Sequence, residues 1–407
     1  MRVLFLSPVS TLGGAERVLI TAVAGVRRAD PSVAVGVLTA GDGPLLAQAR
    51  ALGAEVEAVP VPGALARLGD SQLRSGGKWA GRLALLARTA LAAPAGAGYV
   101  AALRAAVARF RPDVVHSNGI KTHLLSRFAV PRRVPVVWHL HDFYGLRPLA
   151  AKLLRRGSGR VRAGVAISEA VAADTAKALP GVPVRTALNA VDLTRFEPGG
   201  RSTDLDALAG VAPAPAGTVR VGLVAAYARW KGHLAFLDAA QQLAREAPSL
   251  PVRWYIVGGA IYATAAQFSE AELRAAAAER GLADRVAFVP FQTDTADVYR
   301  ALDVMVHAST LPEPFGLTVA EAMACGRAVV VSAAGGAAEL FTDGDDALGA
   351  APGDVPGIAA AVRRFAESAE LRLRLGANAR RTAEAKFDSL RYGPQLLQIY
   401  REVTGPQ

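Results

Sequence analysis

Short runs of β-branched residues alternate with longer Ala-, Leu- and Arg-rich stretches along most of the chain, and this alternation constrains the fold more than any other feature. The short runs are typical of strands, and the longer stretches have helical spacing. Because strands that alternate with helices form parallel sheets covered on both faces, the pattern predicts a doubly wound α/β fold. In the first half it predicts strands at 3–6, 33–39, 114–116, 134–140 and 161–167, with helices such as 16–28 and 99–110 between them.

The alternation stops over residues 191–218 and then resumes. Within this break lie Pro198-Gly199-Gly200 and the run Ala-Pro-Ala-Pro-Ala-Gly at 212–217. Proline and glycine at this density are typical of a linker. Beyond the break, further strands are predicted at 219–224, 253–257, 286–289, 304–307 and 328–332.

The chain has 407 residues, which is more than one hydrophobic core usually serves. We therefore expect two Rossmann-like domains, one over residues 1–187 and the other over 188–387. Ligands of open parallel sheets bind at the carboxyl ends of the strands, so a cleft between the two domains is the expected site. The last helical segment, from about 376 to 404, is longer than the second domain requires. We expect its end, residues 388–407, to cross back to the first domain.

The composition is that of a globular protein, with 52 % apolar and 20 % charged residues. A single cysteine, Cys325, excludes a disulfide framework and a zinc cluster of the Cys/His type, and it fits a reducing compartment. The first apolar run meets Pro8 too early for a signal peptide, and no apolar stretch approaches the ~20 residues of a membrane span. We expect a protein of the cytoplasm that needs no metal ion.

Positive charge is concentrated in the first half. Residues 1–190 hold 25 Lys and Arg against 10 Asp and Glu, whereas residues 191–407 hold 21 against 25. No acid occurs between Asp70 and Asp113 or between Asp142 and Glu169. Such a field favours a phosphorylated acceptor or an anionic membrane surface; solvated arginines on an Arg-rich chain are the alternative. Nucleic acid is not expected, because few aromatic residues lie among the basic ones.

Two glutamates flank a loop that leads into a predicted helix, in the sequence Glu313-Pro-Phe-Gly-Leu-Thr-Val-Ala-Glu321. The flanking prolines keep Glu313 extended, and the helix should begin near residues 316–318, with Glu321 about one turn inside it. The amides of Phe315, Gly316 and Leu317 then lie at a helix N-terminus, where an anion is favoured. The order of acid, amides and acid fits the sugar, diphosphate and ribose of one nucleotide sugar; a loop with two solvated glutamates is the alternative.

Residues 308–330, ASTLPEPFGLTVAEAMACGRAVV, closely resemble the donor-site signature of glycosyltransferase family 4. The members of this family are retaining enzymes of the GT-B fold, so the resemblance implies two facing Rossmann-like domains. It also implies that the donor is a nucleotide-diphosphate sugar, such as a UDP sugar or GDP-mannose. In this interpretation Glu313 contacts the donor sugar and Glu321 the ribose hydroxyls.

The resemblance extends to the first half of the chain. Gly13 and Gly14 match a loop that the family places over the donor diphosphate. His141, beside Asp142 after the predicted strand 134–140, resembles the active-site histidine that hydrogen-bonds the transferred sugar, while His139 is expected to be a buried neighbour. His116 and Asn118 end another predicted strand and are candidates for acceptor or secondary contacts.

Two weaker matches are also candidates for secondary contacts. Ser168 belongs to a strand-end serine motif, and Asn189 to the family's hinge motif Asn-Gly-Val-Asp. Ala190 stands where the family has glycine, so the backbone there cannot cheaply take a positive φ. Asn189 and Asp192 can equally be turn formers.

The basic donor clamp departs from the family pattern. Lys231-Gly232 is in register, yet Ala226 stands where an arginine is expected. If the segment is extended, Arg229 and Lys231 point the same way and both can meet one diphosphate; exposed charges are the alternative. Further along, Gly258 ends a predicted strand in the family's manner, and the loop at Pro290 is expected to contact the base.

These residues predict a retaining transfer of sugar to a hydroxyl acceptor. Two cooperating carboxylates, as in glycosidases, are not apparent, so we favour same-face attack with help from the leaving phosphate oxygen. One alternative is a GT-B sugar-nucleotide epimerase, against which the two glutamates argue. Another is a non-catalytic protein that binds nucleotide sugars, to which only Ala226 points. No GxGxxG sequence supports a nicotinamide enzyme.

Overall fold

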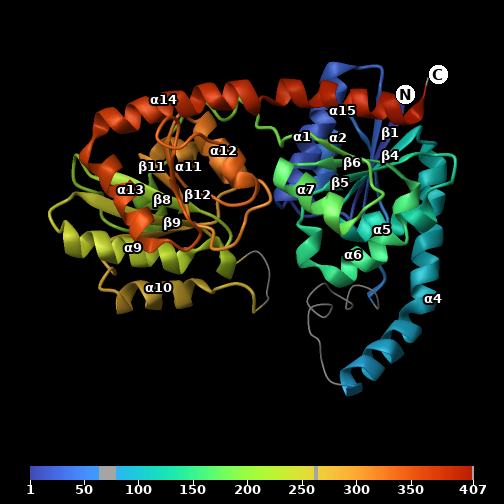
Figure 1. Cartoon of the computed structure of the whole chain (residues 1–407), viewed down its shortest axis with the longest axis horizontal. Coiled ribbons are helices and arrows are strands. Elements are labelled where there is room, and N and C mark those ends of the chain that lie inside the picture. Colours follow the sequence, from blue (N-terminus) through green and yellow to red (C-terminus); the bar gives the residue numbers. More distant parts are fainter. Residues whose placement is uncertain (64–78, 261–264, 406–407) are drawn as a thin grey trace. The chain divides into compact units, whose positions relative to one another are not determined.

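The computed structural model describes residues 1–63, 79–260 and 265–405, with only the backbone of residues 79–93. It divides into two compact units (Figure 1). Unit 1 comprises Met1–Leu188 together with Ser389–Gln407, and unit 2 comprises Asn189–Asp388. Each unit is built around one parallel sheet with its own helices, as the alternating sequence pattern predicts.

The described part of unit 1 holds a seven-stranded sheet in the order β3-β2-β1-β4-β5-β6-β7, with every pairing parallel. The five predicted strands are confirmed to within two residues at their ends, whereas β3 and β7 at the sheet edges were missed. Edge strands are short and partly exposed, so their apolar signal is weak. The strands are β1 (Arg2–Ser7), β2 (Ala34–Thr39), β3 (Glu55–Ala58), β4 (Val114–Asn118), β5 (Val136–Leu140), β6 (Val161–Ala166) and β7 (Val184–Thr186).

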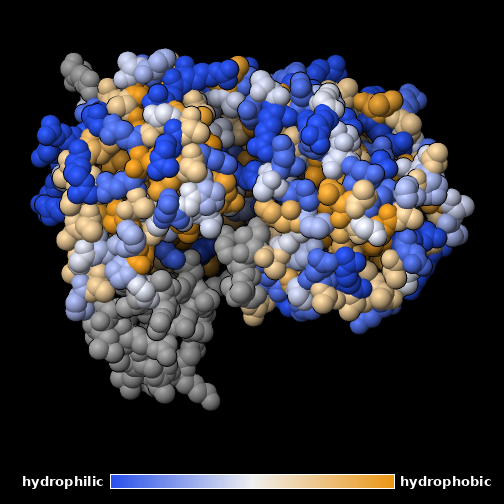
Figure 2. All heavy atoms as spheres, turned by 180° about the vertical axis from the view of Figure 1, so that it is seen from behind, coloured by the Kyte–Doolittle hydropathy of each residue, from blue (hydrophilic) through white to orange (hydrophobic). Residues whose placement is uncertain are grey.

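The helices of unit 1 follow the strands in alternation. The main ones are α1 (Gly14–Ala29), α2 (Pro44–Ala51), α4 (Trp79–Phe110), α5 (Ile120–Ala129), α6 (Pro148–Arg155), α7 (Glu169–Ala178) and α15 (Ser389–Thr404). Among the described residues, no helix combines the length and apolar character that would let it cross a membrane. Figure 2 shows hydrophilic and hydrophobic residues interspersed on the face of each unit that it presents.

The last helix, α15, packs against α1 in unit 1, which confirms the expected return of the chain end (Figure 1). The two helices approach most closely at a pair of glycines. A Cβ on Gly393 would lie 2.0 Å from the carbonyl oxygen of Gly25, so only glycine fits there. The predicted segment 376–404 is not one helix, because α14 (Ala369–Lys386) ends before Phe387 and Asp388, and α15 begins after them.

The described part of unit 2 holds a six-stranded parallel sheet in the order β10-β9-β8-β11-β12-β13. All five predicted strands are present, and only the short edge strand β13 was missed. The strands are β8 (Val219–Val224), β9 (Val252–Gly258), β10 (Val286–Pro290), β11 (Val304–His307), β12 (Ala328–Ser332) and β13 (Leu348–Ala350). The helices are α8 (Leu205–Ala209), α9 (His233–Glu246), α10 (Glu270–Glu279), α11 (Ala296–Ala301), α12 (Leu317–Ala324), α13 (Val355–Glu367) and α14, with short 3-10 turns η4 (Arg229–Lys231) and η5 (Gly336–Glu339).

The linker prediction for residues 191–218 is wrong. This segment belongs to unit 2, where Phe196 and Leu205 are buried and α8 interrupts it. Asp206 on α8 is 1 % exposed and accepts hydrogen bonds from Arg253 and from the Tyr255 hydroxyl, both at 2.8 Å. Its pKa is lowered because these bonds, with one from the Ala214 amide, outweigh the cost of burial. The segment is therefore anchored to unit 2 by a few buried residues, although its prolines and glycines are exposed.

Candidate functional site

A tight turn places Lys231 against the end of β11. Residues 229–231 form the 3-10 turn η4, and Gly232 follows with φ +79°, a conformation that favours glycine. A Cβ on Gly232 would lie 1.7 Å from the Ala308 carbonyl oxygen. The Thr310 amide also donates to the Trp230 carbonyl at 2.8 Å. The Lys-Gly pair that the sequence singled out is thus held directly beside the segment that leads to Glu313.

Glu313 lies in a cluster of four polar side chains and is only 8 % exposed. Lys231 Nζ donates to both of its carboxylate oxygens, at 2.9 Å to Oε1 and 2.8 Å to Oε2. The Ser309 hydroxyl donates to Oε2 at 3.0 Å, and His307 Nε2 lies 3.3 Å from the same oxygen. Burial acts to raise the pKa of Glu313, but Lys231 and His307 outweigh it and hold the pKa well below its usual range. Glu313 is therefore an anion.

The loop around Glu313 is extended, as its prolines predict. The Glu313 amide donates to the Ala334 carbonyl, and the Glu313 carbonyl accepts from the Gly336 amide at 2.7 Å. Helix α12 begins at Leu317, after Gly316 with φ +100°, which confirms the predicted start. The Val319 amide closes the first turn onto the Gly316 carbonyl, so the amides of Leu317 and Thr318 are those that a helix leaves free, and the amides of Phe315 and Gly316 lie just before them.

Two further features fix this loop and helix. The Phe315 ring is buried and lies edge-on to Phe387, with centroids 6.0 Å apart. Glu321 lies on the second turn of α12, where its Oε2 accepts a 2.8 Å hydrogen bond from the buried Tyr299 hydroxyl. Unit 2 therefore offers, along one short path, the carboxylate of Glu313, a helix N-terminus and the carboxylate of Glu321.

The prediction that Arg229 points the same way as Lys231 is wrong, because the segment is a 3-10 turn and not a strand. With three residues per turn, residues i and i+2 point about 120° apart. Arg229 is exposed and pairs with Glu272 at 3.1 Å, and its guanidinium lies 4.2 Å from the Phe268 ring centroid. Its Nε also donates to the Ala265 carbonyl. Arg229 therefore joins η4 to α10, and the only cation of this turn that contacts Glu313 is Lys231.

The other donor-site candidates of unit 2 lie at strand ends. Gly258 ends β9, and a Cβ there would lie 1.9 Å from the Ala225 carbonyl oxygen, so glycine is required by packing. Pro290 ends β10, is exposed, and accepts a hydrogen bond from the Gln292 side chain on its carbonyl. Both occupy the carboxyl edge of the sheet, which is where ligands of such sheets bind.

In unit 1, His141 follows β5 and is held by Asn118 at the end of β4. His141 Nε2 lies 2.7 Å from Asn118 Oδ1, and Asn118 Nδ2 donates to the Ala15 carbonyl. The side-chain nitrogen of Asn118 donates to the Ala15 carbonyl, so the side-chain oxygen of Asn118 faces the His141 ring. This oxygen can only accept, so Nε2 of His141 carries the proton and Nδ1 is an acceptor. Burial lowers the pKa of His141 to about 3, so the ring is neutral near pH 7.

The histidines on β4 and β5 bind the last helix. His116 Nδ1 lies 2.8 Å from the Tyr400 hydroxyl, and His139 Nε2 lies 3.1 Å from the Tyr392 hydroxyl. Both histidines are 0 % exposed. The expectation that His139 is a buried neighbour of His141 is confirmed, with ring centroids 4.0 Å apart. His116 likewise lies in the packing between the sheet and α15.

The remaining candidates of unit 1 lie at helix starts. Gly13 is the N-cap of α1, and its amide donates to the Glu16 side chain at 3.1 Å, while Gly14 is the first helical residue. Ser168 caps α7 by accepting from the Val171 amide at 3.1 Å. Asn189, the first residue of unit 2, is 2 % exposed. The N-termini of α1 and α7 follow β1 and β6, so both lie at the carboxyl edge of the sheet.

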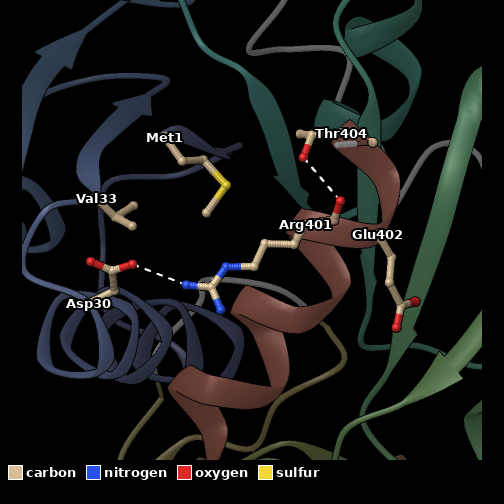
Figure 3. Close-up of a pocket in the computed structure, with 7 residues that line it drawn as sticks. Met1, Asp30, Val33, Arg401, Glu402 and Thr404 are labelled. Atoms are coloured by element: carbon tan, nitrogen blue, oxygen red, sulfur yellow. Dashed lines mark hydrogen bonds and ion pairs between the residues drawn. The ribbon is translucent and has the colours of Figure 1, made fainter. Parts of the chain in front are cut away.

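A cavity of about 530 Å³ lies elsewhere in unit 1. Met1 and Val33 precede β1 and β2, so the cavity is at the amino edge of the sheet, opposite the edge where such sheets bind ligands. Figure 3 shows Arg401 of α15 reaching across it to Asp30, at 3.1 Å. The lining residues are Met1, Asp30, Val33, Arg401, Glu402, Thr404 and Gly405.

Sequence reasoning missed three residues of the site in unit 2. His307 and Ser309 contact Glu313, and Tyr299 contacts Glu321. The available signal was position, because His307 and Ser309 come at and just after the end of a predicted buried strand. Tyr299 lies inside a helix, and nothing in its sequence neighbourhood separates it from a core residue.

Two family models match consecutive parts of the chain. The model described as Glycosyltransferase Family 4 matches residues 12–195, and the one described as Glycosyl transferases group 1 matches residues 211–382. The first match lies almost wholly in unit 1 and the second in unit 2. The chain belongs to the family 4 glycosyltransferases.

Two curated relatives illustrate the similarity. The chain is 37 % identical over 168 residues to the lipopolysaccharide core biosynthesis mannosyltransferase LpsB of Rhizobium meliloti, covering 41 % of this chain and 46 % of that protein. It is 34 % identical over 221 residues to the D-inositol 3-phosphate glycosyltransferase of Saccharomonospora viridis, covering 54 % of this chain and 50 % of that protein. The match thus spans about half the length of each relative.

Solved structures share the fold over the full chain. HepE of Anabaena in complex with UDP superimposes with a TM-score of 0.76 at 25 % identity, covering 98 % of this chain and 99 % of that one. WaaG, a glycosyltransferase involved in lipopolysaccharide biosynthesis, gives a TM-score of 0.67 at 17 % identity, covering 100 % of both chains. The fold is therefore GT-B, as the sequence resemblance implied.

Proposed function

We propose that the protein transfers a sugar from a nucleotide-diphosphate sugar to a hydroxyl acceptor, with retention of anomeric configuration and without a metal ion. The observation that carries the proposal is the contact of Lys231 Nζ with both carboxylate oxygens of Glu313, beside the N-terminus of α12. This arrangement offers a cation and free amides to a diphosphate, and a carboxylate to sugar hydroxyls. Glu321, held by Tyr299, faces the ribose in the same proposal.

The chemistry requires stabilisation of the leaving group. As the bond between the anomeric carbon and the diphosphate oxygen breaks, negative charge develops on the diphosphate. Lys231 and the amides of residues 315–317 supply fixed positive potential there, which replaces the role that a metal ion plays in other transferases. Preorganised groups of this kind typically contribute 10²–10³ in rate each.

The anomeric configuration is retained if the acceptor attacks the sugar from the same face from which the leaving group departs. The acceptor oxygen bonds to the anomeric carbon on that face, and the acceptor proton passes to the departing phosphate oxygen. The described cluster supports this route because Glu313 is engaged by Lys231 and Ser309, which makes it a hydrogen-bond acceptor and a poor nucleophile. His141 presents Nδ1 as an acceptor, which suits a hydroxyl of the transferred sugar.

The donor and the acceptor are proposed only by class. The UDP in HepE and the mannosyltransferase among the relatives support a UDP or GDP hexose as donor. The inositol 3-phosphate and lipopolysaccharide core enzymes support an acceptor that is phosphorylated or linked to a lipid. A thermal-shift screen of UDP, GDP and ADP sugars identifies the donor, because a ligand stabilises only the state that binds it.

We also propose peripheral contact with an anionic membrane, through α6 of unit 1. Three leucines on and just before this helix are exposed to 72, 46 and 37 %, namely Leu146, Leu149 and Leu153. The exposed cations Lys152 and Arg156 lie beside them. Apolar side chains flanked by cations favour the interface of a membrane that carries negative lipids.

Two single substitutions test the donor site. Glu313→Ala and Lys231→Ala should each lower sugar transfer by at least about 10²-fold, because each removes a group that the proposal places on the bound donor. Transfer is measured by release of nucleotide diphosphate in the presence of acceptor, and the fold by circular dichroism. Arg229→Ala is the matched control, and it should retain most activity. Parental activity in either of the first two variants would refute the proposed site.

A further inference from the structure

The ion pair between Lys231 and Glu313 leaves little freedom to either partner. The lysine side chain is 19 % exposed and the glutamate side chain 10 %. The Lys231 ammonium group has three protons, and Nζ donates hydrogen bonds to both carboxylate oxygens of Glu313. The Trp230 ring lies 4.1 Å from Nζ and covers it further. In the free protein, the cation meant for a diphosphate is therefore already neutralised by the carboxylate meant for a sugar.

Among the described residues, Lys231 is the only lysine or arginine that pairs with Glu313. Glu313 also contacts the Ser309 hydroxyl at 3.0 Å and His307 Nε2 at 3.3 Å. Ser309 Oγ also lies 3.0 Å from His307 Nε2, so these two groups share their hydrogen bonds. Removing one partner of a buried ion pair is strongly unfavourable, because the remaining charge stays out of water. A ligand that draws Lys231 away must therefore compensate Glu313.

Only a nucleotide that still carries its sugar can make this exchange. Its diphosphate takes Lys231, while its sugar hydroxyls donate to the vacated carboxylate. A free nucleotide diphosphate takes the lysine and leaves Glu313 with only the contacts to Ser309 and His307. We propose that the Lys231–Glu313 pair makes the site discriminate between the intact donor and the nucleotide diphosphate product, so that the product leaves once its sugar is gone. This inference rests on the proposed function, since it assigns diphosphate to Lys231 and sugar to Glu313.

The inference predicts that a substitution at Glu313 strengthens the binding of one ligand, whereas simple loss of a binding residue would weaken it. Glu313→Gln keeps the shape of the side chain but removes the charge that competes for Lys231. Free nucleotide diphosphate should then bind at least about tenfold more tightly than to the parent, since a buried charge contact is worth more than one factor of ten. The intact donor should gain less, because its sugar already satisfies the carboxylate. The preference for donor over product therefore collapses.

The experiment is isothermal titration with UDP, GDP and ADP, each beside its glucose or mannose conjugate. The pair that binds the parent is then titrated into the variants. Glu272→Gln is the control, because it makes the same chemical change in a carboxylate that pairs with Arg229 of η4 and not with Lys231. It should leave the ratio of the two dissociation constants unchanged. In the double variant Lys231→Ala with Glu313→Gln, the gain for the free diphosphate should vanish, because no cation remains to be released.

The outcomes separate the inference from the function on which it rests. If the parent binds none of the conjugates, the proposed function fails and the inference with it. If the parent binds a conjugate but Glu313→Gln leaves the donor-to-product ratio as it was, the inference alone is overturned. A gain that persists in the double variant also overturns it, since the gain then does not come from Lys231.

Discussion

The two units build the same sheet frame and then use it differently. In unit 1, Asp113 just before β4 accepts a 2.7 Å hydrogen bond from the backbone amide of Arg2 in the neighbouring strand β1. In unit 2, Asp303 just before β11 accepts the same bond, also of 2.7 Å, from the backbone amide of Arg220 in the neighbouring strand β8. Counted from these aspartates, His116 is the third residue and His307 the fourth. Since successive strand residues point to opposite faces, the two histidines face opposite sides of their sheets.

That shift of one residue gives the histidines different partners. In unit 1, His116 faces α15 and bonds to the Tyr400 hydroxyl, and burial lowers its pKa to about 3, so the interior there is polar and neutral. In unit 2, His307 meets the carboxylate of Glu313, which Lys231 balances. Two sheets of the same topology can therefore carry different chemistry. The position of one histidine along its strand decides whether it contacts a helix or a charged loop.

The two units also differ in net charge, which is positive in unit 1 and negative in unit 2. Unit 1 carries 27 Lys and Arg against 11 Asp and Glu, and unit 2 carries 19 against 24. The acidic unit nevertheless holds the lysine that we assign to the donor diphosphate. The proposed anion binding at Lys231 is thus a local property of one turn and one helix N-terminus, and it does not follow the net charge of the unit.

The largest expected effect comes from separating α15 from α1. Gly393→Ala places a Cβ about 2 Å from the Gly25 carbonyl oxygen, so the helices must move apart and the tyrosine bonds to His116 and His139 must lengthen. We expect a loss of about 3 kcal/mol of stability confined to unit 1. Hydrogen exchange measures it, through faster exchange in α15 and β4 and unchanged exchange in β8. Gly98→Ala, on a helix with open space around it, is the control and should not destabilise unit 1. Equal loss of protection in both units would break the comparison.

Much of the fold follows from periodicity, and the exceptions have physical causes. Buried parallel strands such as 328–332 are near-continuous runs of apolar, mostly β-branched residues, and the sequence pattern therefore shows them well. The segment 191–218 was misread because prolines and glycines signal a break in periodicity and do not show whether the chain is packed. Its attachment to unit 2 depends on Asp206 meeting Arg253 and Tyr255, which lie far from it in the sequence.

The candidate site was predictable where one short stretch defines it. Glu313, Gly316 and Glu321 lie within nine residues, and their prolines and helix start fix their arrangement locally. The partner of Glu313 was predictable only as a candidate, since Lys231 is 82 positions away in the sequence. The direction of Arg229 could not be derived, because an extended and a 3-10 backbone are equally compatible with its sequence.

A smaller effect tests the neutral interior of unit 1. His116 has a pKa of about 3 in the folded protein and about 6.5 when unfolded, so only the unfolded state takes up a proton between these values. Its contribution to stability is therefore complete above pH 6.5 and decreases as the pH falls toward 3. His116→Gln removes this titration, so the loss of stability between pH 7 and pH 5 should be smaller than in the parent by about 1–2 kcal/mol.

Hydrogen exchange of β4 at several pH values measures this difference. Between pH 7 and pH 8 the variant and the parent should differ by a constant amount, which is the internal control. Identical acid sensitivity of the two proteins would show that His116 is not kept neutral by the fold, and the contrast with the charged cluster of unit 2 would lose its basis.

The smallest effect concerns the surface charge of unit 1. If the cations beside the exposed leucines of α6 hold the protein at anionic lipid, the double variant Lys152→Gln with Arg156→Gln should lower vesicle binding by roughly tenfold or more, at about 1 kcal/mol per charge. Sedimentation with vesicles of phosphatidylcholine and phosphatidylglycerol measures binding, and 0.5 M salt should reduce it for the parent, since screening shortens the reach of surface charge. Arg274→Gln with Arg363→Gln makes the same change of net charge in unit 2 and should leave binding unaltered. If vesicle binding depended on neither salt nor lipid charge, the arginines of unit 1 would be solvated surface charges and not membrane contacts.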